Sequence, residues 1–244
     1  MAAARMTRAL HLAGFCLTVL SAGNLHASSV TTAKVSCGGE GYRYLVTAGD
    51  PKGPPAPAVL LLHGAGGRPD EMVDAWKKFA AREHIVLIAP ELPRKLEFEA
   101  KAPQVFRCVV EDARRFASVD PQRIFVFGYS MGGYLAFDAA MFDSEYFAAV
   151  AVYGMTINPD YDGIVKEAKR KTPIMLLIGE RDPTLTLAQA RRTRDLLVKN
   201  GFPLEYKELK GRDHNYWADA DEINSSVCKF FDANPLPAAK SPQP

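Results

Sequence analysis

Short apolar runs alternate along this chain with longer segments whose apolar residues recur at helical spacing. A short continuous run is typical of a strand that is buried on both faces of a sheet. An alternating segment at residues 41–47 predicts an antiparallel strand ahead of the first such run. The continuous runs, each predicted to be a buried strand, are residues 58–62, 84–89, the run that begins at Ile124, 147–153, 174–179 and 204–209.

Segments with helical periodicity separate these strands. In residues 70–82, for example, the apolar side chains from Met72 to Ala80 recur on one helical face. Further helices are predicted at residues 104–118, directly after Ser130, at 188–200 and at 219–231, with an irregular loop at 91–103. Buried strands separated by helices indicate an α/β fold with a mainly parallel, doubly wound sheet and helices on both of its faces.

The N-terminal segment does not follow this pattern. Residues 1–27 begin with Arg5 and Arg8, continue with an uncharged and mostly apolar stretch, and close with small residues at Ala27. This order is typical of an export signal, so a secreted or periplasmic protein is expected. The alternative is an uncleaved segment, apolar as far as Leu25, that anchors the protein in a membrane; no stable membrane span is expected elsewhere.

The remainder of the chain forms one predicted domain at residues 28–233, followed by a tail. A chain of 244 residues with 48% hydrophobic residues is sufficient for one sizeable core. Residues 234–244 contain four prolines and few large apolar groups. Such a composition predicts a disordered tail.

Charge and cysteine content narrow the possible functions. The formal net charge is +2, and the two arginines of the N-terminal segment account for it. Without that segment the net charge is zero, which gives no indication of a nucleic-acid partner. Cys37, Cys108 and Cys228 would remain after export and contain no Cys-x-x-Cys pair. A zinc site is therefore not expected, and at most one disulfide can form, with its pairing left open.

The segment Gly128-Tyr-Ser-Met-Gly132 joins a predicted strand to a predicted helix. In such a turn, small residues flank a central residue with strained backbone angles, whose side chain stands at the carboxyl end of the strand. Ser130 is therefore the candidate nucleophile. The alternative is a glycine-rich turn in which the serine is incidental.

A second glycine-rich segment, His63-Gly-Ala-Gly-Gly67, follows the predicted strand 58–62. Pro69 stands where a dinucleotide-binding fingerprint requires Gly or Ala, and no Walker-type Gly-Lys-Ser/Thr follows, which disfavours a phosphate site. We expect an oxyanion hole instead, in which the backbone N–H groups of Ala65 and Met131 face a negatively charged oxygen. A plain tight turn is the alternative.

A carboxylate follows the predicted strand 174–179, in the segment Glu180-Arg-Asp-Pro183. Asp182 is the candidate acid that would orient a histidine. Glu180 is a rival for this role, and an aspartate that only caps the turn is the structural alternative.

Three histidines remain after the export segment: His63, His84 and His214. His84 lies at the start of a predicted strand, which is the wrong end of the sheet, whereas His214 follows the predicted strand 204–209. Ligands of parallel sheets bind at the carboxyl ends of the strands. His214 is therefore the candidate base, and the chain order Ser, Asp, His agrees with this assignment.

Together these motifs resemble the α/β-hydrolase superfamily over residues 42–231. Within it, Leu62-His-Gly-Ala-Gly-Gly67 and Val119-Asp-Pro-Gln-Arg-Ile124 resemble secreted polyhydroxybutyrate-depolymerase-like and feruloyl-esterase-like serine esterases. Dienelactone hydrolases and carboxylesterase/phospholipases are similar too. The resemblance implies hydrolysis of a small-molecule or oligomeric carboxylic ester through an acyl-enzyme on Ser130, without a metal or organic cofactor.

Two other functions stay open at this point. The chain resembles the catalytic domain of prolyl oligopeptidases, because the same three residues also cleave amides, although no propeller-sized domain accompanies it. A noncatalytic binding protein on the same scaffold is the other possibility. The oligomeric state and the acyl and alcohol groups of the substrate do not follow from these motifs.

Loops rather than a lid domain should form the substrate pocket. The interval between Ser130 and Asp182 is too short for a large lid, which leaves residues 91–103 and 155–172 as walls of an open cleft. Three aromatic residues are further candidates for the pocket because they adjoin the nucleophile or the base: Tyr129, Tyr216 and Trp217. The alternative for Tyr216 and Trp217 is that both rings anchor the last helix against the sheet.

Overall fold

The structure is a computed structural model that describes residues 29–92 and 101–238. The predicted export signal at 1–27, the middle of the predicted wall 91–103 and the end of the tail lie outside the described residues. Within the described part, no helix is long and apolar enough to cross a bilayer.

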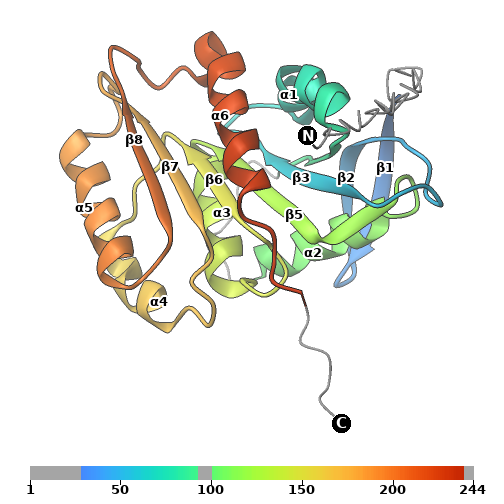
Figure 1. Ribbon diagram of the computed structural model, residues 1–244, viewed down its shortest axis with the longest axis horizontal. Helices are drawn as coiled ribbons and strands as arrows, with labels where there is room; N and C mark the ends of the chain where they lie inside the picture. Colours follow the sequence, from blue (N-terminus) through green and yellow to red (C-terminus); the bar gives the residue numbers. More distant parts are fainter. Residues whose placement is uncertain (1–28, 93–100, 239–244) are drawn as a thin grey trace, which may run out of the picture.

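The described strands form one sheet whose order is β1-β2-β4-β3-β5-β6-β7-β8 (Figure 1). Strand β2 is antiparallel to both of its neighbours, β1 and β4. All the remaining neighbours in this order, from β4 to β8, are parallel. The predicted mainly parallel sheet is confirmed. The strands are β1 (Val30–Cys37), β2 (Glu40–Thr47), β3 (Ala56–Leu62), β4 (Val86–Pro90), β5 (Val119–Tyr129), β6 (Val150–Tyr153), β7 (Ile174–Gly179) and β8 (Leu204–Leu209).

Helices cover both faces of this sheet (Figure 1). They are α1 (Pro69–Glu83), α2 (Ala102–Ala113), α3 (Met131–Phe142), α4 (Asp162–Glu167), α5 (Leu187–Lys199) and α6 (Ala220–Asp232), with 3-10 turns η1 (Pro159–Tyr161) and η2 (Tyr216–Asp219). Successive residues of β3 enter opposite cores, because side chains alternate along a strand. Val59 packs with α1 and α6, whereas Leu60 packs with α2 and α3.

Two details of the predicted elements are wrong. Strand β1 was not predicted, because its buried residues are only Ala33 and Cys37 and a partly exposed edge strand has a weak hydrophobic pattern. His84 belongs to no strand: its φ of 53° ends α1, and its N–H bonds to Ala80. Residues 155–172, predicted as a wall of the pocket, contain η1 and α4.

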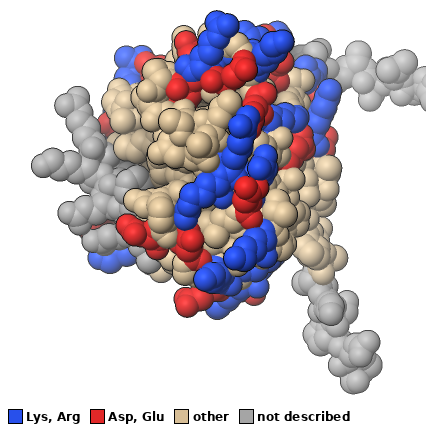
Figure 2. Space-filling view, turned by 90° about the vertical axis from the view of Figure 1, so that its left-hand side faces the viewer, with Lys and Arg blue, Asp and Glu red and all other residues tan. Residues whose placement is uncertain are grey.

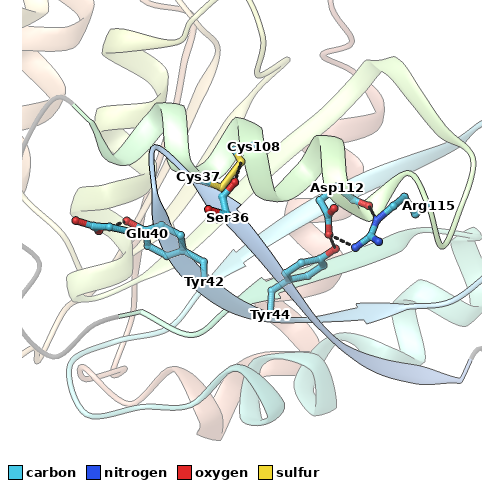
Figure 3. Close-up of a disulfide and its surroundings, with 8 residues drawn as sticks. All are labelled: Ser36, Cys37, Glu40, Tyr42, Tyr44, Cys108, Asp112 and Arg115. Carbon is cyan, nitrogen blue, oxygen red and sulfur yellow. Dashed lines mark hydrogen bonds and ion pairs between the residues drawn. A yellow bond between two sulfur atoms is a disulfide. The ribbon is translucent and has the colours of Figure 1, made fainter.

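A disulfide joins Cys37 at the end of β1 to Cys108 in α2 (Figure 3). Near it, the Tyr44 hydroxyl donates a 2.6 Å hydrogen bond to Asp112 of the same helix. Cys228 is a free, buried thiol in α6. The pairing that the sequence left open is thus Cys37–Cys108, and it attaches the outermost strand to the body of the fold.

The start of the predicted disordered tail packs on the domain. The N–H of Leu236 donates a hydrogen bond to Gln122, and the Leu236 side chain packs against the core of α1 and α6. Leu236 thus supplies an apolar contact that the composition of the whole tail obscured.

Strand β8, which forms the edge of the sheet opposite β1, is flanked by charged side chains of both signs. Figure 2 shows this side of the molecule, where Lys and Arg lie beside Asp and Glu. The ion pairs include Arg191–Glu208 between α5 and β8 and Lys207–Glu205 within β8. Charged side chains on an edge strand disfavour pairing with the strands of other molecules.

Candidate active site

Ser130 occupies a tight turn between β5 and α3. Its φ of 53° and ψ of −118° lie outside the regions that non-glycine residues usually adopt. A Cβ at Gly128 would collide with the backbone of Gly132, and one at Gly132 would collide with the carbonyl oxygen of Leu62. The two flanking glycines are therefore required by close backbone packing, and the serine is held above the carboxyl end of β5.

Ser130, His214 and Asp182 form one chain of hydrogen bonds. The Oγ atom of Ser130 lies 2.9 Å from Nε2 of His214, and Nδ1 of the same ring lies 2.6 Å from Oδ2 of Asp182. With its proton on Nδ1, the ring donates to the carboxylate and accepts from the hydroxyl. The three residues follow β5, β8 and β7, so the carboxyl ends of three parallel strands bring them together.

Asp182 is held by its own loop as well as by His214. Its side chain is fully buried, and Oδ1 accepts hydrogen bonds from Thr184 N at 2.8 Å, Thr184 Oγ1 at 2.7 Å and Leu185 N at 3.0 Å. Burial alone would raise the pKa of Asp182, but the hydrogen bonds from His214, Thr184 and Leu185 outweigh it and lower the pKa below its ordinary value. The carboxylate is therefore ionised at neutral pH.

Glu180, the rival acid, does not contact His214. Its Oε2 accepts a 2.8 Å hydrogen bond from the N–H of Gly211 and so stabilises the loop after β8. Of the two carboxylates, the geometry brings only Asp182 to the imidazole.

Three residues that support His214 and its acid were not predicted from the sequence. Thr184 Oγ1 lies 3.2 Å from Nδ1 of His214 in addition to its bonds with Asp182. Tyr153 at the end of β6 donates a hydrogen bond to the carbonyl of Asp213. Gly154, with φ +68°, lies against the imidazole, and a Cβ there would be 2.8 Å from its Cε1 atom. Of the three, only Thr184 could have been found from the sequence, because a residue two positions after an aspartate in a turn is a common hydrogen-bond partner of its side chain.

The segment predicted to form an oxyanion hole lies beside Ser130. A Cβ at Gly64 would be 3.4 Å from the Cβ of Ser130, so the turn and the nucleophile are in contact. Ala65 is exposed in this turn, and Met131 begins α3, where N–H groups lack helical partners. Among the described residues, neither N–H forms a hydrogen bond. Both are therefore available to an oxygen bound near Ser130.

His63 holds this turn in place. The ring is buried, its Nδ1 lies 2.8 Å from the carbonyl oxygen of Gly64, and its Nε2 accepts a hydrogen bond from the N–H of Leu92 at 3.2 Å.

The turn also borders a cavity of about 560 Å³, lined by residues that include Arg43, Arg68 and Met131. No three metal-ligating side chains converge in the part of the chain that the structure describes.

The three aromatic candidates for the pocket have different positions. Tyr216 is fully buried: its ring lies 5.3 Å from that of Phe127, and its hydroxyl donates to Asn224 at 2.7 Å. The pocket assignment of Tyr216 is therefore wrong, because η2 turns this ring into the core, as the anchor alternative expected. Trp217 is 39% exposed, with its ring 6.0 Å from Tyr129.

Tyr129 lies between the two loops of the site. Its hydroxyl donates a 3.0 Å hydrogen bond to the carbonyl of His214, and the two ring centroids are 5.5 Å apart. On its other side, the Tyr129 ring would be 3.2 Å from a Cβ at Gly64. The side chain therefore supports the His214 loop, and with Trp217 it remains a candidate for contact with substrate.

Comparisons with known proteins identify a family for this chain. The model of the dienelactone hydrolase family matches residues 45–234. NocK, a candidate esterase from Nocardia uniformis subsp. tsuyamanensis, is 27% identical over 175 residues, which are 64% of this chain and 50% of NocK. Acyl-protein thioesterase 1 from Gibberella zeae is 24% identical over 118 residues, or 46% of this chain and 50% of the thioesterase. The chain spans about half the length of these two relatives.

Solved structures show the same fold. A dienelactone hydrolase-like promiscuous phosphotriesterase from metagenomic libraries has a TM-score of 0.72 at 12% identity, covering 86% of this chain and 100% of that one. The predicted α/β-hydrolase fold is confirmed. Because the family model covers most of the described domain, the chain belongs to the dienelactone hydrolase family of the α/β-hydrolase superfamily.

Proposed function

We propose that this protein is a secreted serine hydrolase that cleaves carboxylic esters through an acyl-enzyme on Ser130. The observation that carries the proposal is the continuous hydrogen-bond chain from Ser130 through His214 to Asp182. A buried, ionised carboxylate fixes the imidazole with Nε2 toward the hydroxyl, which is the arrangement that activates a serine for acyl transfer.

The first half of the reaction forms the acyl-enzyme. Nε2 of His214 removes the Ser130 proton as Oγ attacks the ester carbonyl carbon, and the carbonyl oxygen becomes negatively charged. The N–H groups of Ala65 and Met131 stabilise that oxygen. His214, now carrying the proton, gives it to the departing alcohol as the bond from the carbonyl carbon to the alcohol oxygen breaks.

The second half returns the free enzyme. A water molecule loses a proton to His214 and attacks the acyl carbon, and the oxyanion forms again in the same place. The bond to Ser130 Oγ then breaks, Oγ takes the proton back from His214, and the carboxylic acid leaves. Asp182 remains ionised throughout, and its attraction for the imidazolium lowers the barrier of both halves.

Export is the second part of the proposal. The N-terminal pattern of residues 1–27 supports it, and so does the disulfide between Cys37 and Cys108, since disulfides persist mainly in oxidising compartments. The mass of the mature protein recovered from the source cell tests this part. A mature N-terminus at Ser28 is expected, whereas an intact N-terminal segment in a membrane fraction would support the anchored alternative.

A substrate screen tests the reaction. p-Nitrophenyl esters of increasing acyl length, methyl ferulate and a hydroxybutyrate oligomer are compared with p-nitroanilide amides, using the parent protein and Ser130→Ala. Ester hydrolysis that disappears in the variant supports the proposal. Faster cleavage of the amides would favour the peptidase alternative, and no reaction with any substrate or with a fluorophosphonate would favour the noncatalytic one.

A further inference from the structure

Asp138 lies inside the molecule on α3. The residue is 2% exposed. Within the part of the chain that the structure describes, its carboxyl group forms no hydrogen bond or ion pair, and Tyr161 is close enough to interact with it electrostatically. Burial raises the pKa of this carboxyl to about 7. A buried carboxyl without a partner destabilises a fold, and such locally unfavourable positions are expected mainly at functional sites.

Asp138 lines a small chamber with largely aromatic and apolar walls. The volume is about 30 Å³, enough for one water-sized group. The rings of Phe137 and Tyr161 meet edge to face, with centroids 6.4 Å apart. The chamber, called the Asp138 chamber below, is lined by Tyr134, Phe137, Asp138, Met155, Ile157, Asn158 and Tyr161.

This combination of groups is suited to a cation. Aromatic ring faces attract ammonium groups, and the attraction grows where water is excluded. A carboxylate in a medium of low dielectric constant attracts a positive charge more strongly still. Among the described residues that line the chamber there is no Lys or Arg. A terminal ammonium group is close to a water molecule in size.

The Asp138 chamber lies close to the nucleophile. Ser130, Tyr134 and Asp138 are spaced four residues apart, which places them on one side of α3. At 1.5 Å per residue, the chamber floor is about 12 Å from Ser130 along the helix axis. From the other side, Met155 packs against Gly133 and follows Gly154, which lies under His214. The separation of Ser130 and the chamber along α3 is therefore one that a chain of several carbons would span.

Asn158 is exposed and Tyr134 and Tyr161 are half-buried, so the chamber adjoins the molecular surface at one side. We propose that the Asp138 chamber binds the ammonium group of an ester substrate whose carbonyl is attacked by Ser130. This inference rests on the proposed ester hydrolysis and adds a substrate class to it, namely esters that carry a primary amine several carbons from the reacting carbonyl.

The first experiment compares two series of p-nitrophenyl esters at fixed ionic strength. One series has ω-aminoalkanoyl groups of four, six and eight carbons, and the other has alkanoyl groups of the same lengths. The proposal predicts that kcat/KM of the parent favours the amino ester at one length by about tenfold or more. In Asp138→Asn, which keeps the size of the side chain and removes its charge, this ratio should fall to about one.

Asp143→Asn is the matched control. Asp143 ends the same helix, its side chain is 12% exposed, and it pairs with Arg107 away from the chamber. The control loses the same charge and should retain both the hydrolysis of alkanoyl esters and the preference for the amino ester. An equal effect of the two variants, or a parent that shows no preference at any length, would overturn the proposal.

A binding measurement decides the question without ester hydrolysis. n-Hexylammonium chloride should raise the melting temperature of the parent in a concentration-dependent way, and n-hexanol should not. Asp138→Asn should show no shift with either compound. If n-hexylammonium fails to stabilise the parent, the chamber holds only water and the inference is wrong. If no ester is hydrolysed but n-hexylammonium still binds through Asp138, the proposed reaction fails and the cation site stands.

Discussion

The phenol of Tyr153 donates a 2.6 Å hydrogen bond to the carbonyl oxygen of Asp213, the residue before the candidate base. Tyr129 does the same for the carbonyl of His214 at 3.0 Å. Both tyrosines end strands, β6 and β5, so the centre of the sheet fixes the loop that carries the imidazole. The position of His214 above Ser130 thus depends on side chains that take no part in proton transfer.

Tyr153→Phe should therefore lower turnover without abolishing it. The carbonyl of Asp213 loses its partner, which costs about 1–3 kcal/mol when the group stays buried, and the imidazole becomes less well positioned. We expect kcat to fall about tenfold with KM little changed, together with slower labelling by a fluorophosphonate. Tyr206→Phe is the control, because its hydroxyl bonds to Glu208 in the edge strand, away from His214. An equal loss of kcat in both variants would show that Tyr153 has no positioning role.

The choice of acid can be tested by neutralising each carboxylate in turn. Asp182→Asn should reduce kcat by about four orders of magnitude, because the amide favours the wrong tautomer of the histidine. Glu180→Gln removes an acceptor for Gly211 and should cost activity less than tenfold. Steady-state kinetics on one p-nitrophenyl ester distinguish these outcomes. Strong inactivation by Glu180→Gln with an active Asp182→Asn would contradict the assignment.

The lowered pKa of Asp182 also predicts how stability depends on pH. Because its pKa is lower in the folded than in the unfolded protein, its contribution to stability is present above the ordinary carboxyl pKa of about 4 and is lost as pH falls through the folded value. The free energy of unfolding, measured in urea from pH 3 to 7, should fall more steeply below pH 4 for the parent than for Asp182→Asn. Parallel curves would contradict the hydrogen-bond account.

Asp138 predicts the opposite trend. Its pKa is raised to about 7 by burial, and the phenols of Tyr134 and Tyr161 line the same chamber. Folding then favours the protonated acid. The contribution of Asp138 to the free energy of unfolding is therefore greatest near pH 4 and declines as pH rises to about 7, by about 1.4 kcal/mol per unit of pKa difference between the folded and unfolded protein. Asp138→Asn should remove this decline in urea unfolding. A parent curve that stays flat over this interval would contradict the raised pKa.

Trp217 and Tyr216 should respond differently to truncation. Tyr216→Ala empties a fully buried site and should cost about 3–5 kcal/mol of stability. Trp217→Ala removes a half-exposed ring beside Tyr129, so we expect a raised KM and an altered preference for acyl length with a nearly unchanged melting temperature. If the melting temperature of Trp217→Ala falls steeply while the acyl preference is unchanged, Trp217 is an anchor like Tyr216.

Local sequence predicted the site well where its geometry depends on the backbone of one segment. The turn around Ser130 needs Gly128 and Gly132 because any Cβ there would collide with the backbone, and the two glycines are visible in the sequence itself. The convergence of Asp182 and His214 with Ser130 followed from one rule, that parallel strands end at the same edge of the sheet.

Features that depend on contacts between distant segments did not follow from the sequence. Whether Tyr216 enters the core depends on how η2 meets Phe127 and Asn224. The pairing of Cys37 with Cys108 depends on where the outermost strand crosses α2. Asp138 was not singled out, because a single aspartate within an apolar helix has no pattern that distinguishes a buried position from an exposed one.

The central claim is that Ser130 is the nucleophile activated by His214, and covalent labelling tests it most directly. The parent, Ser130→Ala and His214→Ala are each treated with a fluorophosphonate, and the intact mass and the labelled peptide are determined by mass spectrometry. The account predicts one adduct per parent molecule on Ser130, none on Ser130→Ala and much slower labelling of His214→Ala. Labelling of Ser130→Ala at the parent rate, or an adduct on another residue of the parent, would contradict it.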